Sequence, residues 1–153
     1  MSIRVIEKTV DVAAPPERVW DVLLDDATYR QWTAAFAEDC WAETDWSEGS
    51  EVRFLGPGRS GMLGRVVTSR RPELVDVEFD GLVVDGRDDV DSEGAREYRG
   101  AHETYRLSPV PGGTRLDISA AMGGEDYDAM TAAWDDALDS VRRLAEDGAA
   151  ASG

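Results

Sequence analysis

Residues 10–32, VDVAAPPERVWDVLLDDATYRQW, constrain the fold more than any other part of the chain, because their pattern changes abruptly. Apolar residues alternate at the start of this stretch, which predicts a strand. Pro16 then fits the first turn of a helix, where its missing N–H is not needed. Residues Val19–Leu23 carry an apolar stripe at helical spacing, and Tyr29 and Trp32 share one face of a second helix. The predicted order is therefore a strand followed by two short helices.

The middle of the chain alternates apolar and polar residues, which is typical of half-buried strands. Gly- and Pro-containing turns separate these segments, so we expect consecutive strands to pair as antiparallel hairpins. Residues 85–97 are polar and contain glycine, and we interpret them as a hairpin extension or a flexible loop. The predicted strands centre on residues 52–54, 62–68, 75–79, 103–107 and 116–122.

The C-terminal part of the chain predicts one long amphipathic helix that begins near Glu125. Its apolar positions recur at steps of three and four. A domain of 153 residues can bury a single core without disulfides or metals. We therefore expect one domain over residues 1–147 and a disordered tail over residues 148–153. The apolar stripe consists of Tyr127, Met130, Trp134, Leu138, Val141 and Leu144.

The chain is strongly acidic, with a formal net charge of −16. Nucleic acids and anionic membrane surfaces attract basic proteins, so we expect neither as a partner. The chain contains no continuous apolar run of about 18 residues, and we expect no membrane insertion. The acidity is consistent either with a salt-adapted host or with a basic protein partner.

The N-terminus does not resemble a signal peptide, because charged residues interrupt its apolar residues. Cys40 is the single cysteine, so no disulfide can form within the chain. These features predict a cytoplasmic protein. The cysteine count also excludes a CxxC metal site, and we interpret Cys40 as a small buried apolar residue.

Several segments together resemble the SRPBCC group of the START-like superfamily. They are the opening AAPPERVWDVL, the YRQW that follows, the turn SEGSEV, the segment ETYRLSPVPGGTRLDIS and the final AAWDDALDSVRRL. Within this group, these segments most resemble the branch that shares a domain with activators of a heat-shock chaperone ATPase. The resemblance implies an α+β helix-grip fold. In this fold a curved antiparallel sheet of about six or seven strands wraps around the C-terminal helix, with two short helices between the first two strands.

A helix-grip fold implies a cavity between the sheet and the final helix, and the sequence indicates which side chains face it. Strand alternation and the helical stripe direct seven residues inward, and three aromatic residues are expected to close one end. Each of these side chains could equally fill an ordinary core. The inward residues are Phe54, Met62, Phe79, Tyr105, Met122, Met130 and Trp134, and the closing residues are Trp32, Phe36 and Trp41.

Glu103 shares strand parity with Tyr105 and is therefore expected to point inward as well. A buried carboxylate needs a partner or a raised pKa, and such groups concentrate at functional sites. Glu103 is thus our candidate for a polar anchor or an acid–base group. An ion pair with an arginine, or a wet position at the cavity mouth, would explain it without function. His102 has the opposite parity, which predicts a surface histidine.

The run from Asp89 to Gly94 imitates the first half of a calcium loop, but its twelfth position is Gly100 instead of an acidic residue. We therefore predict no metal site and no cofactor. The main functional hypothesis is a monomeric or homodimeric protein that holds a hydrophobic small molecule in the cavity. The first alternative is a polyketide cyclase/aromatase-like or hydratase-like enzyme that uses the same cavity. The second is a chaperone-cofactor or antitoxin-type domain that binds a protein partner.

Overall fold

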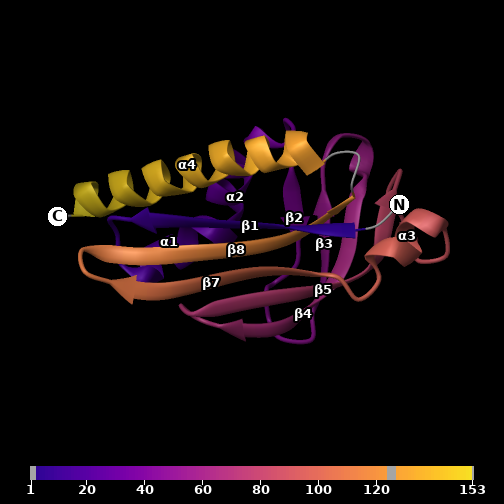
Figure 1. Cartoon of the computed structure of the whole chain (residues 1–153), viewed down its shortest axis with the longest axis horizontal. Helices are drawn as coiled ribbons and strands as arrows, with labels where there is room; N and C mark the ends of the chain where they lie inside the picture. Colours follow the sequence, from indigo (N-terminus) through magenta and orange to yellow (C-terminus); the bar gives the residue numbers. More distant parts are fainter. Residues whose placement is uncertain (1–2, 124–126, 153) are drawn as a thin grey trace.

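The computed structural model describes residues 3–123 and 127–152. One antiparallel sheet curves around a long C-terminal helix, α4, which runs along the sheet from end to end (Figure 1). Two short helices, α1 and α2, follow the first strand and pack beside α4. The α+β helix-grip fold predicted from the sequence is therefore confirmed.

The sheet contains eight strands in the order β1-β8-β7-β5-β4-β3-β2, with β6 paired to β5. Every neighbouring pair is antiparallel. The first and last strands of the chain, β1 and β8, pair with each other along one edge of the sheet. The strands are β1 (Ile3–Val12), β2 (Trp41–Glu43), β3 (Glu51–Leu55), β4 (Gly61–Arg70), β5 (Leu74–Val84), β6 (Arg87–Asp89), β7 (His102–Val110) and β8 (Gly113–Gly123). The helices are α1 (Pro16–Leu24), α2 (Asp26–Trp32), η1 (Thr33–Ala35), η2 (Pro57–Arg59), α3 (Glu93–Tyr98) and α4 (Tyr127–Ser152).

Strand alternation sorts side chains between the concave inner face and the convex outer face of the sheet. On β5, Val75, Val77 and Phe79 are buried, and the acidic residues between them point outward. This is the pattern that a sheet with one covered face requires. The same parity on β7 sends Glu103 and Tyr105 to the inner face.

The register of β4 with β5 shifts at two places. Bulges of this kind increase local twist and bend a strand. Gly64 lies at the first shift, and a Cβ atom there would come within 2.8 Å of the Glu78 carbonyl oxygen. A side chain at position 64 would therefore force the two strands apart at the point where the sheet curves around α4.

The helices present apolar stripes to the concave face. In α1, Val19, Val22 and Leu23 are fully buried. In α4, Trp134, Leu138 and Val141 of the predicted stripe are buried, together with alanines that allow α1 to approach closely. The stripe predicted from spacing is thus the face that grips the core. No helix among the described residues is long and apolar enough to span a membrane.

Three details differ from the sequence prediction. Residues 85–97 extend the β5–β6 hairpin, which was one of the two predicted alternatives, but they then enter the short helix α3, which was not predicted. The Asp89 carboxylate accepts the N–H groups of Asp91 and Ser92, and the Ser92 hydroxyl accepts the N–H of Ala95 at the start of this helix. The sheet exceeds the expected six or seven strands because β2 and β6 have only three residues each. The backbone of α4 continues to Ser152, where we expected a disordered tail from residue 148, since the alanines there favour helix. Glu125, the expected helix start, lies outside the described residues.

The buried stripe of α1 gives a first test of the fold. Leu23 is 1% exposed, whereas the neighbouring Leu24 is only partly buried. We expect Leu23→Ala to lower the free energy of unfolding by about 2–5 kcal/mol, because it leaves a cavity under α4. Leu24→Ala is the matched control and should cost clearly less. Urea unfolding of both variants measures the difference, and equal losses would contradict the packing described.

Candidate functional site

A cavity of about 360 Å³ lies between the inner face of the sheet, the α2–η1 segment and the first turns of α4. Ten of the eleven residues predicted to bind a ligand line it. Their contact with a ligand stays a prediction, but the structure brings the side chains together around one space. The ten are Trp32, Phe36, Phe54, Met62, Phe79, Glu103, Tyr105, Met122, Met130 and Trp134.

Aromatic rings make up much of the cavity wall and contact one another in a continuous chain. Trp134 of α4 packs edge-on against Phe36 at 4.9 Å between ring centroids and lies 6.0 Å from Trp32. On the opposite side, Phe54 and Phe79 meet at 6.1 Å. Edge-to-face contacts of this kind hold the rings in fixed orientations. The wall is therefore a preformed apolar surface built from separate parts of the chain.

Glu103 stands in this apolar wall with one close partner. The Tyr105 hydroxyl donates a hydrogen bond of 2.5 Å to Oε2 of Glu103. Loss of hydration raises the pKa of Glu103 from 4.5 to about 7, although the hydrogen bond from Tyr105 acts in the opposite direction. The side chain keeps some accessible area because it borders the cavity, while protein atoms replace most of its water.

No arginine pairs with Glu103 in the part of the chain that the structure describes, so the structural ion pair considered above does not form. Tyr29 faces the same carboxylate from α2. Burial raises the pKa of both Tyr29 and Tyr105 well above the usual range, and the nearby Glu103 charge adds to the effect. Both phenols are therefore hydrogen-bonding groups at neutral pH. The site combines one titrating carboxyl group with two neutral hydroxyls.

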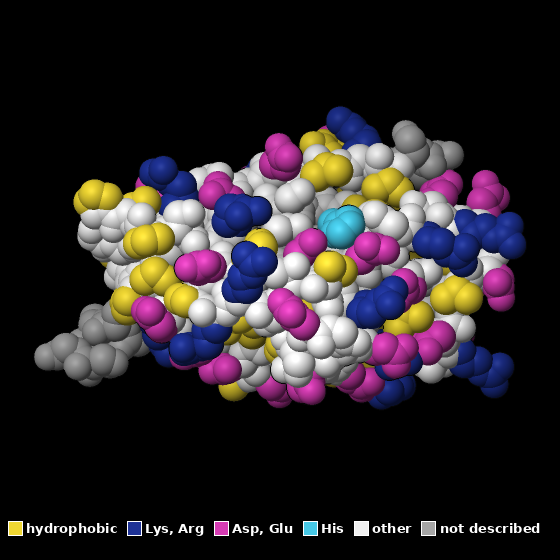
Figure 2. Space-filling view, turned by 90° about the horizontal axis from the view of Figure 1, so that it is seen from below, with side chains coloured by type: hydrophobic (Ala, Val, Ile, Leu, Met, Phe, Trp, Pro, Cys, Tyr) yellow, Lys and Arg dark blue, Asp and Glu magenta, His cyan; other side chains and the backbone are white. Residues whose placement is uncertain are grey.

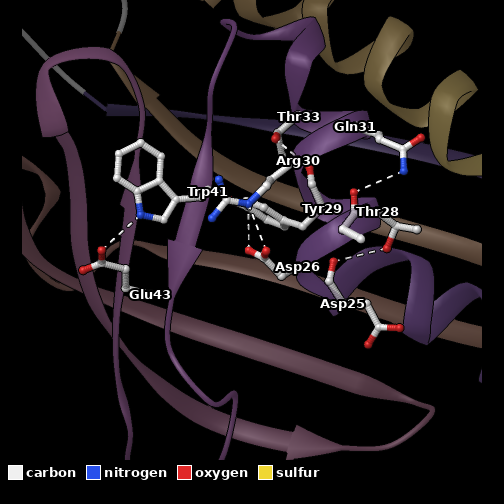
Figure 3. A network of polar contacts seen from close by, with 10 residues as sticks. Asp25, Asp26, Thr28, Tyr29, Arg30, Gln31, Thr33, Trp41 and Glu43 are labelled. Atoms are coloured by element: carbon white, nitrogen blue, oxygen red, sulfur yellow. Dashed lines mark hydrogen bonds and ion pairs between the residues drawn. The ribbon is translucent and has the colours of Figure 1, made fainter.

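Trp41 is the predicted site residue that does not line the cavity. In β2 it pairs with Leu55 and packs on the outer side against Leu55, Leu63 and Val83. Figure 3 shows its indole beside the Arg30 guanidinium, with Nε1 donating a hydrogen bond to Glu43 at 3.1 Å. The segment before β2 is irregular, so the sequence gave no strand parity from which to derive the side that Trp41 faces.

Several lining residues were not in the predicted set, including Tyr29, Cys40 and Tyr98. Tyr29 lies three residues before Trp32 on the same helical face, and this spacing could have predicted that Tyr29 lines the cavity too. Cys40 is half-buried at the cavity wall rather than in the core, and burial raises the pKa of its thiol. Tyr98 belongs to α3, and its ring meets Phe79 at 6.2 Å. It was missed because α3 itself was not predicted.

His102 lies on the outer face, as its parity predicts. Its Nδ1 is 2.9 Å from the Asp76 carboxylate and its Nε2 is 3.6 Å from Glu78. Figure 2 shows the single histidine on a surface where acidic and basic side chains alternate. His102 is therefore separated from the cavity by the sheet. Among residues 3–123 and 127–152, no cluster of three or more His, Cys, Asp or Glu side chains could hold a metal ion.

The comparison with protein families agrees with this architecture. Residues 4–148 match the family described as "Polyketide cyclase / dehydrase and lipid transport". The chain belongs to this family. Its fold and this match place it in the START-like SRPBCC superfamily. No curated protein matches the sequence.

Solved structures share the fold of this family member at low sequence identity. MLL2253 from Mesorhizobium loti has a TM-score of 0.70 and 14% identity, covering 92% of this chain and 96% of its own. The Aha1 dimer from Colwellia psychrerythraea has a TM-score of 0.66 and 17% sequence identity, and the match covers 94% of this chain and 96% of the Aha1 chain. DynU16, from the dynemicin biosynthetic locus, has a TM-score of 0.66 and 16% sequence identity, and the match covers 95% of this chain and 48% of the DynU16 chain. These likenesses establish the fold.

The raised pKa of Glu103 predicts a specific effect of pH on the stability of this polyketide cyclase/dehydrase family member. Between pH 4.5 and about 7 the unfolded chain loses this proton while the folded chain retains it. Stability should therefore fall as pH rises through this window, by up to about 3 kcal/mol from Glu103 alone.

The test compares the wild type with Glu103→Gln, because other carboxylates also titrate. Urea unfolding at several pH values from 4 to 8 gives the free energy of unfolding of each protein. We expect Glu103→Gln to gain stability relative to the wild type as pH rises. Parallel profiles would show that Glu103 is ionised without penalty.

Proposed function

We propose that this protein binds a largely apolar small molecule in the cavity and holds one polar group of that molecule at Glu103 and Tyr105. The observation that carries the proposal is the cavity itself: about 360 Å³, walled mostly by aromatic and aliphatic side chains, with Glu103, Tyr105 and Tyr29 close together in the wall. Small-molecule sites have this composition, because the apolar wall gives affinity and a few polar groups give orientation.

The polar end has unused hydrogen-bonding capacity. Tyr105 occupies Oε2 of Glu103, while Oε1 accepts no hydrogen bond from the described residues. The Tyr29 hydroxyl likewise has no hydrogen-bond partner among them, although Tyr29 is only 7% exposed. Neither atom is fully buried, and both residues line the cavity, so a ligand or ordered water there can pair with them.

A catalytic use of the same cavity is the second candidate, and the pKa of Glu103 favours it. A carboxyl group with a pKa of about 7 can either donate or accept a proton near neutral pH. The description of the family also names cyclases and dehydrases. In this role Glu103 would move a proton on a bound polyketide-like molecule, and Tyr105 would position the carboxyl group through its hydrogen bond.

Native mass spectrometry of gently purified protein, followed by a thermal-shift screen of lipids, aromatic polyketides and flavonoids, tests binding. We expect a bound small molecule or a saturable rise in Tm. A ligand at 100 times its Kd should add about 2.7 kcal/mol to the free energy of unfolding. An empty protein and no shift across the screen would contradict the proposal and favour a protein partner.

Variants then locate the binding site. Ala120 faces the cavity directly beside Glu103 in the sheet register, so Ala120→Leu should fill the polar end and weaken binding at least tenfold. Ser119→Leu, on the outer face of the same strand, is the matched control. Thermal unfolding without ligand verifies that both variants fold. Equal ligand affinity in the two variants would place the ligand elsewhere.

The hydroxyl of Tyr105 provides a finer test of the anchor. Tyr105→Phe removes the hydrogen bond to Glu103, and we expect weaker ligand binding by about tenfold. Thr104→Val removes a comparable hydroxyl–carboxylate hydrogen bond to Asp76 on the outer face and should leave affinity unchanged. For an enzyme, Glu103→Gln should abolish turnover while ligand binding persists. Calorimetric titration and product analysis measure the two effects separately.

A further inference from the structure

The cavity has an unusual distribution of charge. Glu103 is the one acidic side chain among its described lining residues, and no lysine, arginine or histidine lines it. The basic side chains are used elsewhere: Arg53 pairs with Asp88 at 2.7 Å and Arg115 with Asp11 at 2.9 Å, both on the surface. A carboxylate in an apolar wall without a counter-ion is costly. The described cavity wall thus contains the acidic Glu103 but no basic side chain to pair with it.

The side chains around Glu103 suit a positive group. Tyr105 lies 6.4 Å from Trp32 and 6.3 Å from Trp134, measured between ring centroids. The ring centroid of Tyr29 lies 5.2 Å from that of Trp32. Aromatic rings attract cations through their electron-rich faces, and the attraction is stronger where water is excluded. Trp32 and Trp134 therefore pack around the ring of Tyr105, whose hydroxyl binds Glu103, and Tyr29 packs against Trp32.

We propose that the ligand of this cavity is cationic: an amine or quaternary ammonium group attached to an apolar body, with Glu103 as its counter-ion and the surrounding aromatic rings as its cage. The inference rests on the proposed function and specifies the class of ligand. The hydroxyls of Tyr29 and Tyr105 complete the polar end, and the remaining aromatic wall accommodates the apolar body.

A neutral ligand is the competing occupant, because a protonated Glu103 could donate a hydrogen bond to a carbonyl or hydroxyl oxygen. The two ligands respond to pH with opposite signs. A cation needs ionised Glu103, so its affinity should rise as pH increases through about 7. A neutral acceptor needs protonated Glu103, so its affinity should fall over the same range.

Few other groups could produce this pH dependence. The titratable side chains that line the cavity with Glu103 are Tyr105 from β7, Tyr29 from α2, Tyr98 from α3 and Cys40 before β2. Burial raises the pKa of Tyr29, Tyr105 and Cys40, which keeps all three protonated below pH 8. A transition near pH 7 in the binding of a cation therefore reports Glu103.

The experiment uses three probes with one apolar body and different end groups: phenylbutylamine, phenylbutanol and phenylbutanoate. Calorimetric titration of the full chain at pH 8 measures their affinities. We expect the amine to bind at least about tenfold more tightly than the alcohol, and the carboxylate to bind most weakly. With an amine pKa of about 10, the probe stays charged throughout.

The pH dependence is measured with the amine. From pH 8 to pH 6 its affinity should fall about tenfold, because the ionised fraction of Glu103 falls from about nine-tenths to about one-tenth. Glu103→Gln should remove both the preference for the amine and its pH dependence. Glu78→Gln, on the outer face of the sheet, is the control and should change neither. The thermal unfolding of both variants is compared with that of the wild type.

The outcomes separate this inference from the proposed function. An alcohol that binds as tightly as the amine, or an amine whose affinity rises as pH falls, overturns the inference but leaves an apolar ligand in place. The same holds if other compounds of the wider screen bind and the amine does not. Failure of every compound to bind overturns both proposals. Retention of the amine preference in Glu103→Gln also overturns the inference, since the carboxylate would then not be its source.

Discussion

The central constraint of this structure is that a strongly curved sheet must be filled by one long helix and two short ones. The two register shifts between β4 and β5, with Gly64 at the first of them, increase the local twist and bend of the sheet. Alanine, valine and leucine side chains fill the middle of the concave face. Near the first turns of α4, large aromatic residues and methionines line the cavity. The cavity is the space that these rings leave between them.

Glu103 is a carboxyl group in a position where burial opposes its ionisation. Its neighbours on the inner face are apolar, and an apolar side chain of similar size in its place would avoid the desolvation penalty. The hydrogen bond from Tyr105 compensates only in part, since the pKa of Glu103 remains near 7. Polar groups retained at such a penalty concentrate in binding and catalytic sites. This cost supports the proposal that the cavity holds a ligand.

Strand parity explains how much of this site is predictable from sequence. Phe79, Glu103 and Tyr105 lie in regular strands of nine to eleven residues, where every second side chain shares a face. Trp41 lies in a three-residue strand after an irregular segment, where the facing side depends on tertiary packing against Leu55 and Leu63. Helix α3 depends on the local caps of Asp89 and Ser92, whose acidic sequence resembled a loop. Short elements fixed by a few side-chain contacts escape periodicity arguments.

The distribution of charge over the whole molecule connects the surface with the cavity. Many surface carboxylates are matched by arginines, as in the pairs of Arg53 with Asp88 and Arg115 with Asp11, yet the formal net charge remains −16. Such a field lowers the local concentration of anions and raises that of cations. Inside, the aromatic wall excludes water and strengthens the interaction of Glu103 with any positive group that enters. The weak long-range attraction of the acidic surface and the strong short-range attraction of Glu103 thus both favour a positively charged ligand. The attraction of Glu103 persists even where salt screens that of the surface.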